Sequence, residues 1–83
     1  YQNNPYGAKL FPNPFNQNAT LSFTNIKNEK LKLDIVDIQG KIVKDLGFIN
    51  GNNYYFENLN LPNGLYFYRL TGLKTQVGKL LIE

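Results

Sequence analysis

The chain has 83 residues and a mass of 9.5 kDa, which is enough for one small domain and too little for two. Hydrophobic residues make up 42% of the chain and charged residues 18%, so the composition favours a folded core over disorder. The absence of Cys and His excludes disulfides, thiol nucleophiles, imidazole bases and the usual zinc sites. We therefore expect a binding or structural module, not an enzyme, with no metal and no cofactor.

The net charge of +3 is a weak indication of a polyanionic partner. The nine cations are scattered, and Arg69 is the only arginine, whereas phosphate-binding proteins more often carry clustered Lys and several Arg. No stretch approaches the roughly 18 apolar residues of a membrane span, and the first residues do not resemble a signal peptide. We expect neither nucleic-acid binding nor a membrane span. Because the chain does not begin with Met, we expect it to be a piece of a longer polypeptide.

The first residues are polar and contain Pro and Gly, which predicts that residues 1–9 are the end of a linker and residues 10–83 the domain. Leu10 and Phe11 predict a short first strand. The following Pro12-Asn13-Pro14 has two fixed φ angles and lacks two N–H groups, so it predicts a sheet edge or a bend. Such a stiff, exposed segment suits recognition by a partner, although an ordinary entry bend explains it equally well.

Alternating apolar and polar residues over 19–24 and 31–36 predict two half-buried antiparallel strands. Lys32 and Asp34 are predicted to face solvent. The inward-facing positions are Leu21, Phe23, Leu31, Leu33 and Ile35.

The sequence Asp37-Ile38-Gln39-Gly40 predicts a type I turn followed by Gly in a left-handed conformation. The chain should then reverse into a strand over residues 41–44, with Leu46 still covering the core. A functional interpretation of the Asp37, Gly40 and Lys41 motif is possible, but turn chemistry alone explains it. A calcium loop would need more regularly spaced oxygen ligands than Asp34 and Asp37 supply.

The second half of the chain predicts three further strands. Tyr54 to Phe56 follow a run of Asn and Gly, and Leu59 and Leu61 lie in a segment that crosses to the next strand. The strongest predicted strand covers residues 65–71, and a hairpin through Gly72 leads to a last strand over residues 76–82. The inward-facing positions of the strongest strand are Tyr66, Tyr68 and Leu70.

Six to seven short strands with frequent turn signals predict an all-β domain, an immunoglobulin-like antiparallel β-sandwich. Asn63-Gly64-Leu65-Tyr66 decides this choice, because immunoglobulin-like domains often place a Tyr just inside the sixth strand, with its hydroxyl bonded to upstream backbone. An ordinary amphipathic core residue is the alternative interpretation of Tyr66. The exposed aromatic residues could also form a stacking surface, and the carboxylates could form an acid/base pair, but core packing and the lack of a cleft argue against both.

Three segments, in this order and spacing, resemble the type A C-terminal sorting domain of the type IX secretion system of Bacteroidetes-type bacteria. They are Phe-Pro-Asn-Pro-Phe-Asn at residues 11–16, the segment at 33–43, and Leu-Pro-Asn-Gly-Leu-Tyr-Phe-Tyr-Arg-Leu at 61–70, followed by Gly-Lys-Leu-Leu-Ile at 78–82. The resemblance covers residues 10–83. One departure is Glu83, where many members end in a basic residue.

The resemblance implies a secretion and sorting signal at the C-terminus of a larger cargo protein. Such a domain directs the cargo from the periplasm across the outer membrane, and a sorting peptidase commonly removes the domain, so that the cargo is secreted or held at the cell surface. The expected partners are the outer-membrane secretion machinery and this peptidase, with cleavage in residues 1–9. The residues that match the family motifs, and are therefore candidates for partner recognition, are Pro12, Asn13, Pro14, Gly40, Lys41, Gly64, Tyr66, Gly78 and Lys79.

We further expect the last strand, residues 76–82, to lie with residues 12–14 at one exposed sheet edge, where a receptor could add a strand. Gly78 within that strand indicates a bulge or a close approach of another group. The alternative function is a carbohydrate-binding or adhesive immunoglobulin-like module. The oligomeric state is left open.

Overall fold

A computed structural model describes residues 5–12, 18–25, 28–57 and 59–83, and these residues form β-strands joined by turns. No helix occurs in these ranges. The strands are β1 (Lys9–Phe11), β2 (Asn18–Ser22), β3 (Leu31–Val36), β4 (Ile42–Ile49), β5 (Asn53–Glu57), β6 (Gly64–Thr71) and β7 (Thr75–Ile82).

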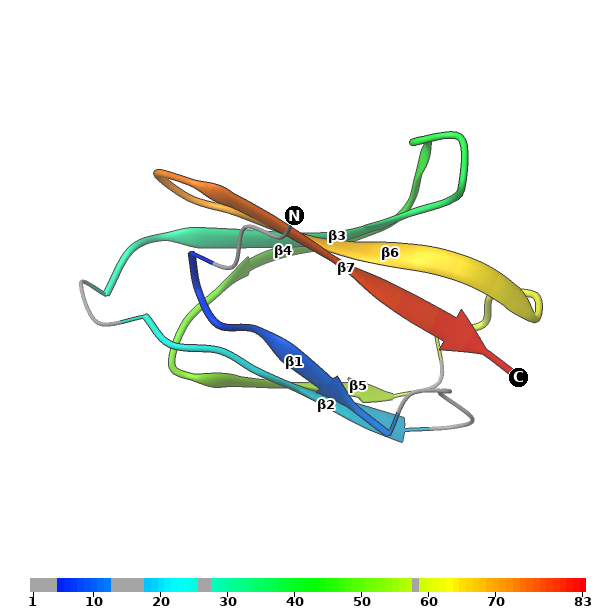
Figure 1. Cartoon of the computed structure of the whole chain (residues 1–83), viewed down its shortest axis with the longest axis horizontal. Coiled ribbons are helices and arrows are strands. Elements are labelled where there is room, and N and C mark those ends of the chain that lie inside the picture. Colours follow the sequence, from blue (N-terminus) through cyan, green and yellow to red (C-terminus); the bar gives the residue numbers. More distant parts are fainter. Residues whose placement is uncertain (1–4, 13–17, 26–27, 58) are drawn as a thin grey trace.

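The seven strands form two antiparallel sheets that lie face to face (Figure 1). One sheet has the order β1-β2-β5, and the other has the order β4-β3-β6-β7. The predicted antiparallel β-sandwich is therefore confirmed. In a constant-type immunoglobulin domain the fourth strand pairs with the fifth, whereas here β4 pairs with β3.

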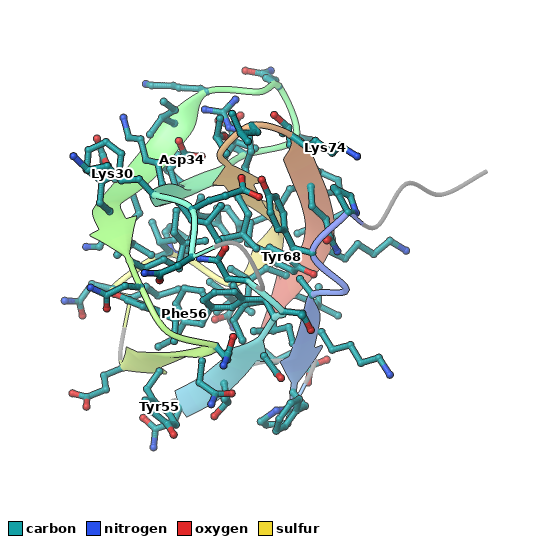
Figure 2. The ribbon with its side chains drawn as sticks, turned by 90° about the vertical axis from the view of Figure 1, so that its left-hand side faces the viewer. Lys30, Asp34, Tyr55, Phe56, Tyr68 and Lys74 are labelled. Carbon is teal, nitrogen blue, oxygen red and sulfur yellow. The ribbon has the colours of Figure 1, made fainter. Side chains whose placement is uncertain are left out.

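The core follows from the two-residue periodicity of the strands, because alternate side chains point into the space between the sheets. The predicted inward-facing residues of β2, β3 and β6 are all buried, and Figure 2 shows Phe56 and Tyr68 between the sheets, with Tyr55 outside. The buried apolar residues of the core are Tyr6, Ala19, Leu21, Phe23, Leu31, Leu33, Ile35, Ile49, Phe56, Leu59, Tyr66, Tyr68, Leu70, Leu80 and Ile82.

Strand β4 is longer than the sequence predicted. We expected a strand over residues 41–44, but β4 runs to Ile49 and passes through Gly47 at φ 75°. Its pairing with β3 contains two register shifts, one on each side of the Asp34–Asp45 pair. These irregularities break the alternation of apolar and polar residues, which is why the pattern did not reveal the second half of the strand.

The prediction that Asp34 is exposed to solvent is wrong. This residue lies on the outer face of β3, as its position in the alternation requires, but it is only 3% exposed. Arg69 on the neighbouring strand β6 lies directly opposite Asp34 and covers it. A charged side chain can be buried on an outer sheet face when such a partner neutralises it.

The two edge strands β1 and β7 lie on the same side of the sandwich, and the other two edges, β4 and β5, lie on the opposite side (Figures 1 and 2). The expected edge position of the last strand is thus confirmed. Residues 5–8, which we call the lead-in segment, precede β1 and run beside the start of β7, where the Gln76 side chain bonds to them. The predicted boundary between residues 9 and 10 stays a prediction, but Tyr6 and Ala8 before it already pack in or against the core.

Candidate recognition surface

The turn between β3 and β4 holds the candidate residues Gly40 and Lys41. The Asp37 carboxylate accepts hydrogen bonds from the backbone N–H groups of Gln39 and Lys41, both at 2.9 Å, and the Gly40 N–H donates to the Asp37 carbonyl at 3.0 Å. Gly40 has a φ of 86°, as the predicted turn requires. The turn is therefore self-contained, and it presents Ile38, Gln39, Gly40 and Lys41 to solvent.

The start of β6 holds the candidates Gly64 and Tyr66. The Tyr66 ring is buried, and its hydroxyl donates a 2.7 Å hydrogen bond to the carbonyl of Pro62, four residues upstream. This is the geometry of the tyrosine corner that the sequence suggested. Gly64, the first residue of β6, pairs with Ile82 near the end of β7.

The middle of β7 holds the candidates Gly78 and Lys79. Gly78 lies opposite Tyr68 on β6, and a Cβ at this position would overlap the Tyr68 ring and hydroxyl. The predicted close approach at Gly78 is thus confirmed, and it is an internal contact. Lys79 alternates to the outer face, where it is exposed opposite Phe67.

Of the first motif, Pro12 is exposed directly after β1. Asn13 and Pro14 lie outside the described residues. β1 and β7 are edge strands of different sheets that share one side of the sandwich (Figure 2), and Pro12 follows directly after β1.

The fold brings several candidates to one end of the molecule. The β3–β4 turn, the start of β6 and the end of β7 gather at the right-hand end in Figure 1. On the outer face, Ile42, Val36, Phe67 and Lys79 are consecutive cross-strand neighbours from β4 to β7. Residues from the second and third sequence motifs thus form one surface, which we call the hairpin end, with cationic Lys41 and Lys79 and partly exposed Ile42 and Leu65.

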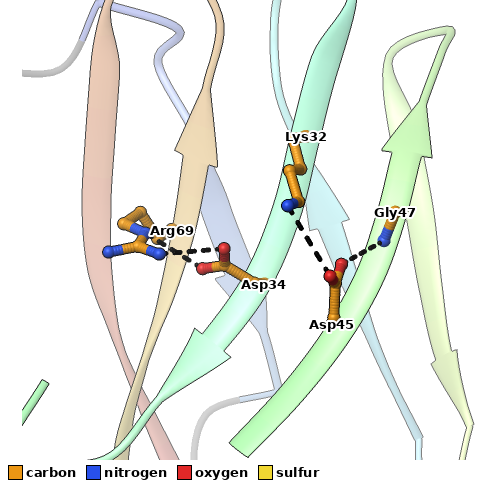
Figure 3. A network of polar contacts seen from close by, with 5 residues as sticks. All are labelled: Lys32, Asp34, Asp45, Gly47 and Arg69. Atoms are coloured by element: carbon orange, nitrogen blue, oxygen red, sulfur yellow. Dashed lines mark hydrogen bonds and ion pairs between the residues drawn. The ribbon is translucent and has the colours of Figure 1, made fainter. Parts of the chain in front are cut away.

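Sequence reasoning missed the ion pair at the centre of the outer face, shown in Figure 3. Arg69 Nε and Nη2 each donate to one Asp34 oxygen, both at 3.0 Å. These hydrogen bonds and the negative charge raise the pKa of Arg69, although burial opposes the shift. A signal was present, because both residues occupy outward positions of predicted strands, but only the structure shows that these two strands are neighbours in the sheet.

Sequence reasoning also missed the contacts of the lead-in segment. Gln76 is 2% exposed and bonds to the backbone of Tyr6 and Ala8, about seventy positions away in the chain. The Tyr6 hydroxyl donates to Glu29 at 2.8 Å. Burial, together with the neighbouring carboxylate, raises the pKa of Tyr6. No short-range pattern signals contacts between such distant residues.

In the part of the chain that the structure describes, no three His, Cys, Asp or Glu side chains form a group that could hold a metal ion. The described residues also contain no helix long and apolar enough to cross a membrane. The exposed features of the hairpin end, two lysines beside apolar side chains, can bind a protein surface.

A scan against protein families matches the secretion system C-terminal sorting domain over residues 9–83. The chain belongs to this family. No curated protein and no solved structure matches it. The sorting domain is thus a C-terminal signal for type IX secretion, and its presence implies export through the outer membrane to the cell surface or the medium.

Membership of the sorting-domain family also bears on the alternatives. The family is not enzymatic, and its role implies interaction with the secretion machinery. The carbohydrate-binding or adhesive module is not favoured.

Proposed function

We propose that this sorting domain is read by the outer-membrane secretion machinery at its hairpin end and along the edge strand β7, and that it has no catalytic activity of its own. The observation that supports this most directly is the position of β7. It is the last strand of its sheet, and its exposed residues of the final sequence motif lie toward the same end of the sheet as the β3–β4 turn of the middle motif.

A partner can recognise an edge strand by adding a strand of its own to the sheet. Lys79 on β7 and Lys41 at the turn then supply positive charge at the two margins of the hairpin end. Exposed charges of this kind steer association and select partners of opposite charge. The receptor surface should therefore be apolar at its centre and acidic at its margins.

The candidate residues divide into two groups in this proposal. Lys41, Lys79 and Pro12 are exposed and can touch a receptor. Asn13 and Pro14 lie outside the described residues and stay candidates through their sequence motif alone. Gly40, Gly64, Tyr66 and Gly78 act indirectly, because they hold the turn, the corner and the two paired strands in shape. We further propose that the domain follows a larger cargo and that the sorting peptidase of the system separates the two.

The test is the export of a folded reporter fused before residues 1–83, in a bacterium that has the type IX system. Removing the last residues, 80–83, should leave the reporter in the periplasm. Because that truncation also removes the core residues Leu80 and Ile82, the decisive variants are Lys41→Glu and Lys79→Glu, which reverse exposed charges and leave the core intact.

Lys30→Glu is the matched control, because Lys30 is also exposed but lies at the opposite end of the sandwich, over the Phe48 ring. We expect export to fall several-fold for the Lys41 and Lys79 variants and to stay unchanged for the Lys30 variant, with all three equally folded by circular dichroism. Equal export of all four fusions, wild type included, would contradict recognition at the hairpin end.

A further inference from the structure

The backbone of the lead-in segment is bonded to the folded domain at its first peptide units. The Tyr6 N–H donates to the side-chain oxygen of Gln76 at 3.0 Å, and the Tyr6 carbonyl accepts from the Thr24 N–H at 2.8 Å. These groups belong to the Pro5–Tyr6 and Tyr6–Gly7 peptide units. Both units are therefore attached to elements of the domain that are distant in sequence.

The next two peptide units are bonded as well. The Ala8 N–H donates to the same Gln76 oxygen at 3.3 Å, and the Ala8 carbonyl accepts from the Gln76 amide at 3.4 Å and from the Tyr68 hydroxyl at 3.5 Å. Four consecutive peptide units, from Pro5–Tyr6 to Ala8–Lys9, are thus each bonded to the domain. Gln76 is 2% exposed, so its amide cannot leave these groups without opening the core.

The Tyr6 side chain anchors the same segment. Its ring is 3% exposed, and its hydroxyl donates to Glu29 at 2.8 Å while accepting from the Lys74 N–H at 3.2 Å. Glu29 also accepts from the Leu73 N–H at 3.0 Å. Tyr6 therefore joins the loop before β3 to the turn between β6 and β7.

A peptidase needs these same backbone groups. It binds the chain in an extended form through N–H and C=O groups on both sides of the scissile bond, so a segment bonded in a folded domain is cleaved only from a locally opened state. Opening the lead-in segment requires the Tyr6 ring and four bonded peptide units to leave the domain together. The cleavage rate at these bonds is then reduced by the rarity of the open state.

We propose that the four peptide bonds from Pro5–Tyr6 to Ala8–Lys9 are closed to cleavage, so that processing cuts the chain on the N-terminal side of Pro5 and Tyr6 departs with the domain. In the hydrolysis, the amide C–N bond breaks, and water gives its hydroxyl to the acyl carbon and a proton to the nitrogen. The inference rests on the proposed function only in that a peptidase of the secretion system makes the cut. It narrows the expected cleavage region, residues 1–9, to its first part.

The protection can be tested without any secretion machinery. The reporter fusion to residues 1–83 is treated with a protease of broad specificity, and intact mass identifies the first residue of each domain fragment over time. Wild type should give fragments that begin at or before Pro5. In Tyr6→Ala and Gln76→Ala, fragments that begin between Tyr6 and Lys9 should form about thirtyfold faster than the same fragments of the wild type, since the hydrogen bonds that close the segment are lost.

Two further variants keep the test informative. Tyr6→Phe retains the buried ring and loses only the hydroxyl, so it should fold even if Tyr6→Ala does not, and cleavage should rise about fivefold. Tyr55→Ala, which removes an exposed tyrosine of β5, should match wild type. Wild-type fragments that begin between Tyr6 and Lys9 at the rate seen for the variants would overturn the proposal.

The outcome separates this inference from the proposed function. If the lead-in segment is protected in the protease assay but the Lys41 and Lys79 variants are exported normally, the proposed recognition at the hairpin end is refuted, and the proposal that the lead-in segment is closed to cleavage is supported. If those variants are not exported and the processed wild-type domain begins at Gly7 or Ala8, recognition stands and the closed segment is refuted.

Discussion

The two ends of the β6–β7 hairpin are held by different kinds of contact. The hairpin end is the one at which β6 begins and β7 ends, opposite the β6–β7 turn. There the Tyr66 hydroxyl bonds to Pro62, and Asp37 bonds within the β3–β4 turn, so each contact joins residues four positions apart or fewer. At the other end, Tyr68 and Gln76 bond to Ala8 and Tyr6, sixty to seventy positions away.

This difference has a physical consequence. Local contacts cost little loop-closure entropy, so the hairpin end can form as soon as its own strands pair. The contacts of the lead-in segment can form only when the last strand has docked on the rest of the domain. The hairpin end is therefore suited to presenting residues to a receptor. The contacts at the other end are complete only when the whole domain has folded.

The largest expected effect comes from the ion pair between the two ends. Arg69→Leu should lower the free energy of unfolding by about 3 kcal/mol, because it leaves the buried Asp34 carboxylate without its partner. The Asp34 side chain is 4% exposed and that of Arg69 35% exposed. Chemical denaturation measures the change.

The second ion pair of Figure 3 supplies the control. Lys32 Nζ lies 3.6 Å from Asp45 Oδ2, and the two side chains are 40% and 56% exposed. Lys32→Leu should change the free energy of unfolding by less than about 0.5 kcal/mol, since exposed pairs contribute little. Equal losses in the two variants would show that burial does not distinguish the pairs.

The next effect concerns the end that holds the lead-in segment. Gly78→Ala should destabilise the domain by about 2 kcal/mol, because the added Cβ overlaps the Tyr68 ring, which must shift and thereby disturb its hydrogen bond to Ala8. Thermal unfolding measures this loss, and the protease assay should show faster cleavage after Tyr6. Val77→Ala, at the exposed neighbouring position, should stay within about 0.5 kcal/mol of wild type.

A smaller effect is expected at the hairpin end. Tyr66→Phe removes the hydrogen bond to Pro62 and should cost about 1 kcal/mol, without faster cleavage in the lead-in segment. Denaturation and the protease assay together test the separation of the two ends. If the stability does not change, the hydrogen bond from Tyr66 to Pro62 does not stabilise the domain. If cleavage in the lead-in segment becomes faster, the two ends are coupled.

The same local and distant contacts explain how much the sequence could predict. The turn at Asp37 to Gly40, the corner at Tyr66 and the inward residues of β3 follow from short-range chemistry, and the structure confirms them. The burial of Asp34 depends on which strand lies beside β3, and the order of strands in a sheet is not written in any one segment. The roles of Tyr6 and Gln76 depend on the complete fold, and the polar opening sequence gives no local signal of them.

The candidate surface was predictable to a similar degree. The motifs named its residues, and Lys41 and Lys79 lie exposed where a receptor can reach them. The motifs could not distinguish residues that touch a receptor from residues that maintain the fold. A motif includes both kinds, such as an exposed lysine and the glycine that makes room for the Tyr68 ring. Only the position of each side chain relative to the sheets distinguishes the two.

The smallest effect is invisible at neutral pH and appears only in alkali. Burial raises the pKa of Tyr6 and of Tyr68 above the ordinary value of 10.0, and the Glu29 carboxylate adds to the shift of Tyr6. Above pH 10 the unfolded chain loses these protons while the folded domain retains them, so the free energy of unfolding should be unaffected below pH 10 and should fall as the pH rises through the raised pKa values. Tyr6→Phe should make that fall shallower, because it removes one of the two groups with a raised pKa. Denaturation curves between pH 8 and pH 11 measure the slopes, and identical slopes for wild type and Tyr6→Phe would mean that the lead-in segment opens before the domain unfolds.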